Sequence, residues 1–267
     1  MNIWSGGKKG NSKMSKAVVI VGLAGSGKTW VSYSIWDWFR NRKQDVSIFN
    51  LDPGATNLPY NPDFDIREEI DLWRVMERYK LGPNGALIVS MDLMVNSVES
   101  INKSIRSIGT PLIIIDTPGQ MEVFLYRASG KIILDSLDID ELLIIYVIDG
   151  LFAKDPRNFV SSILLGGTLK MRFNFPLVSA LNKIDLLDEK DVKTLLKYFR
   201  SPLTLKKDLH THYSTFESDF IFKSFLLMKK YEIYTDFVPI SAVYLTNFYS
   251  LIAVITRILF GGEEYYS

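Results

Sequence analysis

The feature that most constrains this chain is the stretch from Ala17 to Thr29, where an apolar run leads into a glycine-rich loop and a helical pattern. Residues 22–29 read GLAGSGKT and fit the pattern G-x-x-x-x-G-K-[ST]. Glycines let such a loop curl so that its N–H groups point at a phosphate, and the next helix adds partial positive charge. A plain glycine turn is the alternative. The apolar stripe of the following helix favours a phosphate site; it comprises Val31, Ile35, Trp38 and Phe39.

Each position of this loop has a predicted role. The Lys28 ammonium can reach the β- and γ-phosphates, which also makes it a candidate catalytic group. The Thr29 hydroxyl can bind Mg²⁺. The predicted nucleotide-binding positions of the loop are Gly22, Gly25, Ser26, Gly27, Lys28, Thr29 and Trp30.

Composition limits the domain organisation and the classes of function that are possible for this chain. A chain of 267 residues suits one large domain or one domain with a sizeable insertion. The net charge of +1 gives no sign of a surface that coats nucleic acid, and the lack of cysteine excludes disulfides and cysteine-bound zinc. No apolar run approaches the roughly 20 residues of a membrane helix, so we expect no membrane partner and a cytoplasmic location.

The start of the chain differs in composition from the rest. Residues 1–16 are rich in Gly, Ser, Asn and Lys, which predicts a flexible arm, an expression scar or sequence upstream of a start at Met14. A single nucleotide-binding domain is expected from residue 17 to residue 267.

Apolar runs alternate with helical patterns along the chain, which predicts an α/β fold with three layers and a mostly parallel central sheet. Most runs are nearly continuous, as expected for strands covered by helices on both faces. Ligands of such folds bind at the carboxyl ends of the strands. The predicted strands are 17–21, 46–51, 111–115, 142–148, 177–181 and 237–240.

Two carboxylates follow predicted strands. Asp52 either faces the metal of the phosphate site or belongs to a common Asp-Pro-Gly turn. Asp116 follows four apolar residues and can hold Mg²⁺ through water, while Gly119 lets the backbone approach the γ-phosphate. Beside an intact phosphate loop, we prefer this interpretation to an ordinary turn. The candidate metal ligands are Thr29, Asp52 and Asp116.

Base recognition is indicated by the Asn-Lys-x-Asp pattern at 182–185, which follows a buried strand. Asp185 can accept two hydrogen bonds from the N1–H and the exocyclic amine of guanine, which adenine cannot supply. Lys183 can lay its stem against the base, and Asn182 can bridge the base edge and the phosphate loop. GTP and GDP are therefore the predicted ligands. A weaker match follows the last strand, where backbone N–H groups would meet the guanine oxygen, at Ser241 and Ala242.

Between the two carboxylates lies the sequence Gly82-Pro83-Asn84, followed by Gly85. Read locally, it is a tight turn, because proline presets φ and Asn-Gly tolerates left-handed backbone. In order with the motifs above, it resembles the signature of the GPN-loop GTPases, a family in the SIMIBI class of phosphate-loop NTPases. Many GTPases share the other motifs, but not this one. Within the family, the length without long tails resembles the archaeal single-copy type, and the absence of cysteine fits a thermophilic source.

The resemblance implies a homodimer whose active sites face each other, with the loop at 82–84 reaching the partner's phosphates. Asn84 would then act in trans and stabilise the γ-phosphate, in the role that an arginine finger plays elsewhere. Asp116 and Gln120 would order the attacking water, with Asp116 as the candidate base. Asp52 would lie near Mg²⁺ and its waters.

Two features depart from this pattern, namely Trp30 and the segment Asp52-Pro53-Gly54, which matches the family's second motif only approximately. Trp30 stands where many members carry a small hydroxyl residue, so its phosphate contact would come from the backbone N–H while the indole packs at a dimer or nucleotide edge. The segment 186–236 is too long for a plain loop and predicts a helical insertion. Its apolar residues at 219–234 either complete the core or offer an apolar groove to a client protein.

We therefore predict a homodimeric, Mg²⁺-dependent GTPase that hydrolyses GTP to GDP and phosphate and switches shape to assist the assembly of an unknown client protein. The resemblance implies RNA polymerase as that client in eukaryotic relatives, which reaches this chain by analogy alone. A GTP-binding scaffold with negligible turnover and a SIMIBI-type kinase stay open as alternatives. Such kinases usually lack a guanine motif, and partitioning-type ATPases carry an extra early lysine in the phosphate loop.

Overall fold

The computed structural model describes residues 15–231 and 237–261. Most of the predicted N-terminal arm, residues 1–14, lies outside the described residues. The last two residues of that arm belong to the fold instead. Ser15 is buried and its hydroxyl donates to the Thr110 carbonyl at 3.0 Å, and strand β1 begins at Lys16. The predicted arm was two residues too long, because composition gives no sign of where pairing with the sheet begins.

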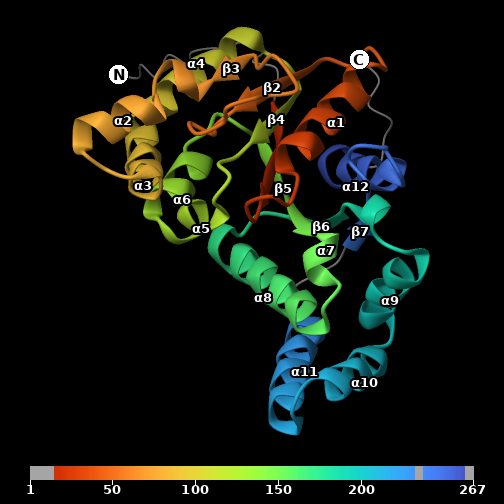
Figure 1. Ribbon diagram of the computed structural model, residues 1–267. Helices are drawn as coiled ribbons and strands as arrows, with labels where there is room; N and C mark the ends of the chain where they lie inside the picture. Colours follow the sequence, from red (N-terminus) through yellow and green to blue (C-terminus); the bar gives the residue numbers. More distant parts are fainter. Residues whose placement is uncertain (1–14, 232–236, 262–267) are drawn as a thin grey trace, which may run out of the picture.

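A sheet of seven strands forms the centre of the fold, in the order β3-β2-β4-β1-β5-β6-β7 (Figure 1). Every neighbouring pair is parallel, which confirms the predicted α/β class. Because β4 lies between β1 and β2, the loops that follow these three strands meet at one edge of the sheet. The strands are β1 (Lys16–Gly22), β2 (Val46–Asn50), β3 (Phe64–Asp65), β4 (Leu112–Asp116), β5 (Glu141–Asp149), β6 (Leu177–Asn182) and β7 (Phe237–Pro239).

Strand β3 was not predicted from the sequence. It has two residues at the sheet edge, paired as Phe49 with Phe64 and Asn50 with Asp65. A strand this short shows no periodic pattern that separates it from a loop.

Helices cover both faces of the sheet (Figure 1). Side chains of β1 alternate between the two cores, with Val18 and Ile20 facing α1 and α12, and Val19 and Val21 facing the larger core on the other side. No helix within the described ranges is long and apolar enough to cross a membrane. The helices are α1 (Lys28–Arg40), η1 (Ile66–Glu68), α2 (Leu72–Tyr79), α3 (Pro83–Met94), η2 (Val95–Ser97), α4 (Val98–Ile108), α5 (Met121–Tyr126), α6 (Ala128–Asp135), α7 (Gly150–Ala153), α8 (Pro156–Phe173), η3 (Ile184–Leu186), α9 (Glu189–Arg200), α10 (Pro202–His212), α11 (Thr215–Lys230) and α12 (Phe248–Phe260).

The segment Gly82-Pro83-Asn84 begins helix α3 and does not form the tight turn that its local sequence suggests. Gly82 is the N-cap in extended conformation, and Pro83 is the first helical residue. Proline suits this position because its missing N–H would have no helical partner and its φ is already helical. The Asn84 side chain is therefore presented on the first turn of a helix.

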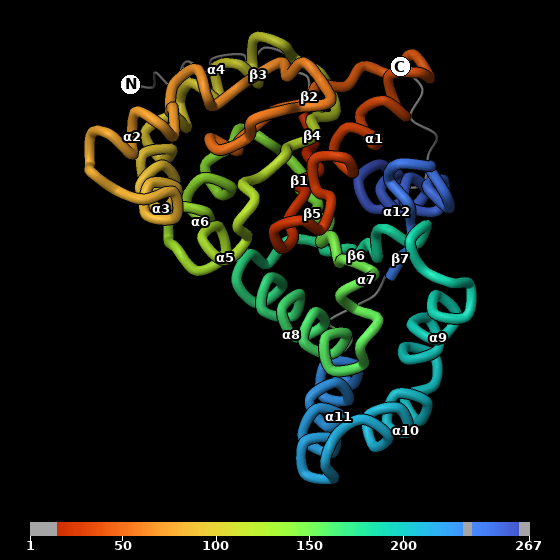
Figure 2. The backbone as a smooth tube through the Cα atoms, in the orientation of Figure 1, coloured from red at the N-terminus to blue at the C-terminus, as the bar shows by residue number. Residues whose placement is uncertain are grey.

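Helices α10 and α11 lie beyond the N-terminal end of α8, away from the sheet, and α9 leads to them from the sheet side (Figure 2). They fill most of the segment 186–236 that we predicted as an insertion, of which 232–236 lie outside the described residues. Phe159 of α8 joins these helices to the core, with its ring centroid 5.1–6.1 Å from those of four other aromatic residues, Tyr198, Phe199, Phe225 and Phe237. The assignment as an insertion stays a prediction.

The apolar residues of this segment divide between the core and the surface, and the apolar groove for a client stays a prediction. Phe222 and Phe225 are buried and complete the core under α8. On the outer side of α11, Phe216, Phe220 and Leu227 are 83%, 66% and 55% exposed. Helix α11 thus carries apolar residues on two faces, one packed against the core and one exposed.

Replacing Phe159 by alanine should remove the centre of the aromatic cluster and leave a cavity. We expect a loss of about 3–5 kcal/mol in the free energy of unfolding, measured by denaturant titration. The matched control is Phe216→Ala, which deletes an exposed ring of the same size and should change stability by less than about 0.5 kcal/mol. Equal losses in the two variants would contradict this account of the core.

Candidate nucleotide site

The predicted phosphate loop lies between β1 and α1 and requires glycine at defined points. Gly25 and Gly27 have φ values of 76° and 93°, a region that L-residues with side chains rarely adopt. A Cβ on Gly22 would lie 2.5 Å from the Val147 carbonyl oxygen, and one on Gly27 would lie 2.5 Å from Nδ2 of Asn182. The loop is therefore closely packed against β5 and β6, and its Ser26 hydroxyl is buried with no hydrogen-bond partner among the described residues.

Lys28 links this loop to the segment after β4. Its buried Nζ donates to the carbonyl oxygens of Gly22 and Leu23, each at 2.9 Å, and of Gly119 at 3.0 Å. Burial lowers the pKa of Lys28 below its usual value, while the nearby Asp116 and Asp52 oppose this change. Three carbonyl groups thus satisfy an ammonium that, in a nucleotide complex, would turn to phosphate oxygens.

Asp52 combines the two roles that its sequence left open. Its Oδ1 accepts the Gly54 N–H at 2.8 Å, which forms the local turn. Its Oδ2 accepts the Gly119 N–H at 3.1 Å across the gap between β2 and β4. Burial raises the pKa of Asp52, and the two N–H groups work against that rise. Gly119 is thus held on both sides, by Asp52 at its N–H and by Lys28 at its carbonyl oxygen.

Asp116 lies deeper, at the end of β4 with 1% of its surface exposed. Its Oδ2 accepts the Tyr60 hydroxyl at 2.8 Å. Its Oδ1 has no hydrogen bond of ordinary geometry within the described part of the chain, although the nearby Thr29 hydroxyl favours the charged carboxylate. Burial raises the pKa of Asp116 to about 6.

The Asp116 and Thr29 pair fits a magnesium ion. A buried carboxylate oxygen without a partner beside a hydroxyl is a hard oxygen donor set, which Mg²⁺ prefers. Groups of three or more acidic or histidine side chains that could hold a metal are absent from the described residues. Mg²⁺ usually takes one or two protein ligands and completes its shell with water and phosphate, so two donors suffice. Asp52 has both oxygens on backbone N–H groups, and its role as a ligand stays a prediction.

The two remaining candidate catalytic residues meet at the surface. Nε2 of Gln120 donates to Oδ1 of Asn84 at 2.9 Å. This contact lies within one chain, although the resemblance places Asn84 at the phosphates of a partner. This contact uses only the side-chain oxygen of Asn84, so the N–H₂ group of Asn84 can donate to a third group.

The base-recognition residues are joined to the phosphate loop. Nδ2 of Asn182 donates to the Ser26 carbonyl at 3.0 Å, and its Oδ1 accepts the Ala242 N–H at 3.1 Å. One amide thus ties together the phosphate loop, the end of β6 and the segment after β7. Ser241 is buried beside it, and its Oγ accepts the Tyr244 N–H.

Lys183 adopts left-handed backbone, with φ of 65°, and crosses over the loop. Its Nζ lies 2.6 Å from the Gly25 carbonyl oxygen and 2.6 Å from Oδ2 of Asp149. The Asp149 carboxylate therefore fixes the direction of the lysine stem. Oδ1 of Asp149 also accepts the N–H groups of Leu151 and Phe152 at the start of α7.

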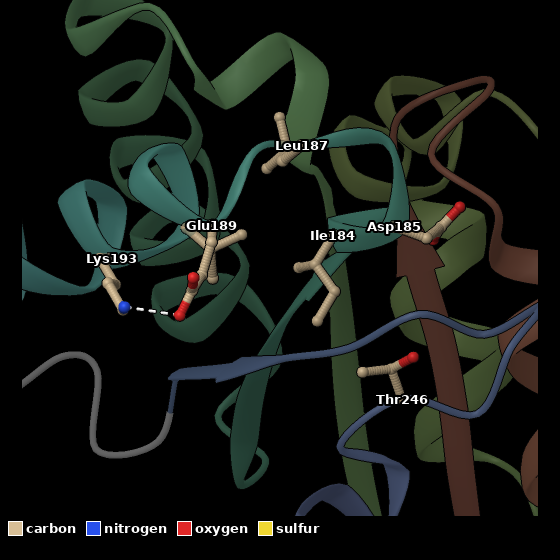
Figure 3. A pocket seen from close by; sticks show the side chains of 7 residues that line it. Ile184, Asp185, Leu187, Glu189, Lys193 and Thr246 are labelled. Atoms are coloured by element: carbon tan, nitrogen blue, oxygen red, sulfur yellow. Dashed lines mark ion pairs between the residues drawn. The ribbon is translucent and has the colours of Figure 1, made fainter.

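Asp185 is exposed in η3 at the rim of a cavity of about 360 Å³. Figure 3 shows its carboxylate pointing away from the ion pair of Glu189 and Lys193, which lines the same cavity. Trp30 is 47% exposed at the start of α1, and its ring meets that of Tyr33 edge-on at 5.8 Å. Within the described part of the chain, no hydrogen bond or ion pair joins either side chain to another predicted site residue.

Three site residues were missed by the sequence analysis: Tyr60, Asn50 and Asp149. Asp149 ends an apolar strand just as Asp116 does, so the same signal could have identified it. Asn50 bonds to the backbone of Asp52 and to Asp65, which braces the loop that follows β2. Tyr60 lies in an irregular loop, where no spacing marks it.

The comparisons with known proteins agree on the family of this chain. A family model described as a conserved hypothetical ATP binding protein matches residues 20–260. A GPN-loop GTPase of Pyrococcus abyssi is 36% identical over 184 residues, which cover 68% of this chain and 73% of that protein. GPN-loop GTPase 1 of Schizosaccharomyces pombe is 32% identical over 85% of this chain and 64% of its own length.

Structural comparison gives the same family. The crystal structure of a GTPase from Pyrococcus abyssi in its apo form superposes with a TM-score of 0.80 at 30% identity, covering 93% of this chain and 98% of that one. The chain spans about half to two thirds of the length of the eukaryotic relatives named GPN-loop GTPase 1.

Replacing Asp116 by asparagine should change how stability depends on pH. The pKa of Asp116 in the folded chain is about 6, above the value of 3.8 that it has when exposed. The folded state therefore binds the proton more tightly, and its stability falls as the pH rises through this interval. Asparagine cannot ionise but keeps an oxygen for Tyr60. From pH 4 to pH 7 the variant should gain on the order of 2 kcal/mol relative to the parent.

The measurement is denaturant unfolding in EDTA without nucleotide. The exposed Asp188→Asn is the control and should follow the parent at every pH. Parallel pH curves for Asp116→Asn and the parent would show that burial does not perturb this carboxyl group.

Proposed function

This chain belongs to the GPN-loop GTPase family, and from this membership we propose that it hydrolyses GTP to GDP and phosphate. The observation that carries the proposal is the side chain of Asn182, which bonds to both the phosphate loop and the segment after β7. A nucleotide whose base is bound by Asp185 would thus have its phosphates at the loop formed by residues 22–29. The description of the matching family model names ATP, so the choice of base needs its own test.

On the phosphate side, nucleotide binding would exchange one set of partners for another. Lys28 would leave the carbonyl groups of Gly22 and Leu23 for the β- and γ-phosphates. The Gly119 N–H would leave Asp52 for the γ-phosphate. The second change would move Gly119, so the segment that carries Gln120 would report whether the γ-phosphate is present.

Thr29 and Asp116 would hold Mg²⁺, which when bound neutralises charge on the β- and γ-phosphates. Asp116 is buried near Thr29, which supports a role as a metal ligand better than a role as the general base that activates water. Gln120 is the better candidate to orient the attacking water, because it follows Gly119 directly and lies at the surface. Asn84, bonded to Gln120, would supply its amide N–H₂ to the γ-phosphate in the transition state.

We also propose a homodimer in which Asn84 acts on the partner's nucleotide. The exposure of Asn84 on the first turn of α3 supports this arrangement. The contact between Asn84 and Gln120 in one chain supports the alternative, action in cis. Client assembly, with RNA polymerase as the family analogy, is the proposed output, and the exposed apolar side of α11 is the face that a client could meet.

Guanine selectivity tests the proposed activity. GDP should bind far more tightly than ADP, and GTP should be turned over in preference to ATP. Asp185→Asn should lower GDP affinity by roughly 100-fold or more, because the amide presents an N–H₂ group to the guanine donors. The control is Asp188→Asn, an exposed aspartate of the same segment, which should bind GDP as the parent does. Equal affinity of the parent for GDP and ADP would sink the proposal.

A mixing experiment separates action in trans from action in cis. Asn84→Ala should lower kcat roughly 100-fold with GDP affinity nearly intact, and Lys28→Ala should be inactive. If Asn84 acts in trans, a mixture of the two restores turnover, because the Lys28→Ala chain supplies Asn84 to the intact loop of its partner. If it acts in cis, the mixture keeps the low turnover of Asn84→Ala. The control is Asn96→Ala, an exposed asparagine of η2, and light scattering with a GTP analogue reports the dimer.

A further inference from the structure

Tyr60 lies in the loop between β2 and β3, yet it is buried with 6% of its surface exposed. Its ring belongs to the core that α1 and α12 cover, together with Ile48 and Ile114. Its hydroxyl donates to Oδ2 of Asp116 at 2.8 Å. A loop residue thus passes through the core to reach the carboxylate at the end of β4.

The position of Tyr60 is fixed from both sides. Three residues further on, the Asp63 N–H donates to the Ile48 carbonyl at 2.8 Å, and the Asp63 carboxylate accepts the Ile48 N–H at 2.8 Å. At the other end of the loop, Asp52 is held by Gly54 and Gly119. The aromatic ring has few rotamers and a single donor, so it can hold an acceptor at one place.

The two oxygens of Asp116 are consequently unequal. Oδ2 is occupied by the protein, and Oδ1 is buried with no hydrogen bond of ordinary geometry to a described residue. The hydroxyl groups of Thr29 and Ser32 lie near this carboxylate and favour its charged form. A buried carboxylate with both oxygens free could rotate about its terminal torsion, which is broad, and would have no defined direction for a metal.

We propose that Tyr60 is a positioning residue for the metal: by holding Oδ2, its hydroxyl directs Oδ1 of Asp116 toward the ion bound beside Thr29. This rests on the proposed function, since the metal arrives with the nucleotide. Tyr60 touches neither the substrate nor the metal, and it acts through the orientation of Asp116. Second partners of metal ligands commonly set metal affinity in this way.

The test is the affinity of the GDP complex for Mn²⁺, read from the electron paramagnetic resonance signal of the free ion. Tyr60→Phe removes one oxygen and keeps the ring. We expect Mn²⁺ to bind roughly 10-fold or more weakly, the usual cost of losing such a partner. GDP affinity measured in EDTA should stay as in the parent, because Tyr60 lies away from the base and the phosphate loop.

The chain offers a matched control in Tyr198, which is 3% exposed and donates to Oδ2 of Asp208 at 2.8 Å. Tyr198→Phe deletes the same kind of bond far from the site, so it reports the general cost of losing a buried hydroxyl. Its Mn²⁺ affinity should equal that of the parent.

The outcomes are distinct. Weaker Mn²⁺ binding in Tyr60→Phe alone, with unchanged GDP affinity in EDTA, supports the proposal. Unchanged Mn²⁺ binding overturns it, and so does an equal loss in Tyr198→Phe. A loss of GDP affinity in EDTA would assign Tyr60 to the shape of the nucleotide site and also overturn it. A parent protein that binds GDP neither with Mg²⁺ nor in EDTA fails the proposed function itself, which these two measurements report separately from the effect of Tyr60→Phe.

Discussion

Gly119 is the residue on which the site depends. Its carbonyl oxygen accepts Lys28 and its N–H donates to Asp52, so three segments meet at one residue. This meeting is a consequence of strand order, because β4 lies between β1 and β2 and each of these strands delivers one of the three residues. A buried ammonium and a buried carboxylate each need partners, and the backbone of one residue supplies a partner to each. In the proposed function, a γ-phosphate would compete for the same two contacts, so its arrival would move Gly119.

Burial changes the pKa values of the charged groups around Gly119 in opposite directions. It lowers the pKa of Lys28 and raises those of Asp52 and Asp116, so each charge is costly here without its neighbours. The site brings together one cation and two carboxylates. A nucleotide with its metal would replace the carbonyl partners of Lys28 with stronger ionic ones.

The parts of the site that the sequence could predict are those tied to regular structure. Asp116 was found because four apolar residues deliver it to a strand end, and Asp149 could have been found in the same way. Gly82 to Asn84 was misread locally as a turn, because the same residues suit both a turn and the start of a helix. Tyr60 could not be found, because its contact with Asp116 joins a loop to a strand 56 positions away. Such contacts follow from tertiary packing and leave no periodic trace in one sequence.

The base-recognition residues are connected to helices α9, α10 and α11 by a continuous series of contacts. Asp149 holds Lys183 with one carboxylate oxygen and the first N–H groups of α7 with the other. Helix α7 leads into α8, whose N-cap Asp155 accepts the Tyr213 hydroxyl from the segment before α11. Lys183 rests on the phosphate loop through Gly25. A shift of that loop would therefore change the contacts of Asp149 at the start of α7. Helix α8 follows α7 and contacts α11 through Phe159 and Phe225, so the base site is linked to α11 through residues that touch in series.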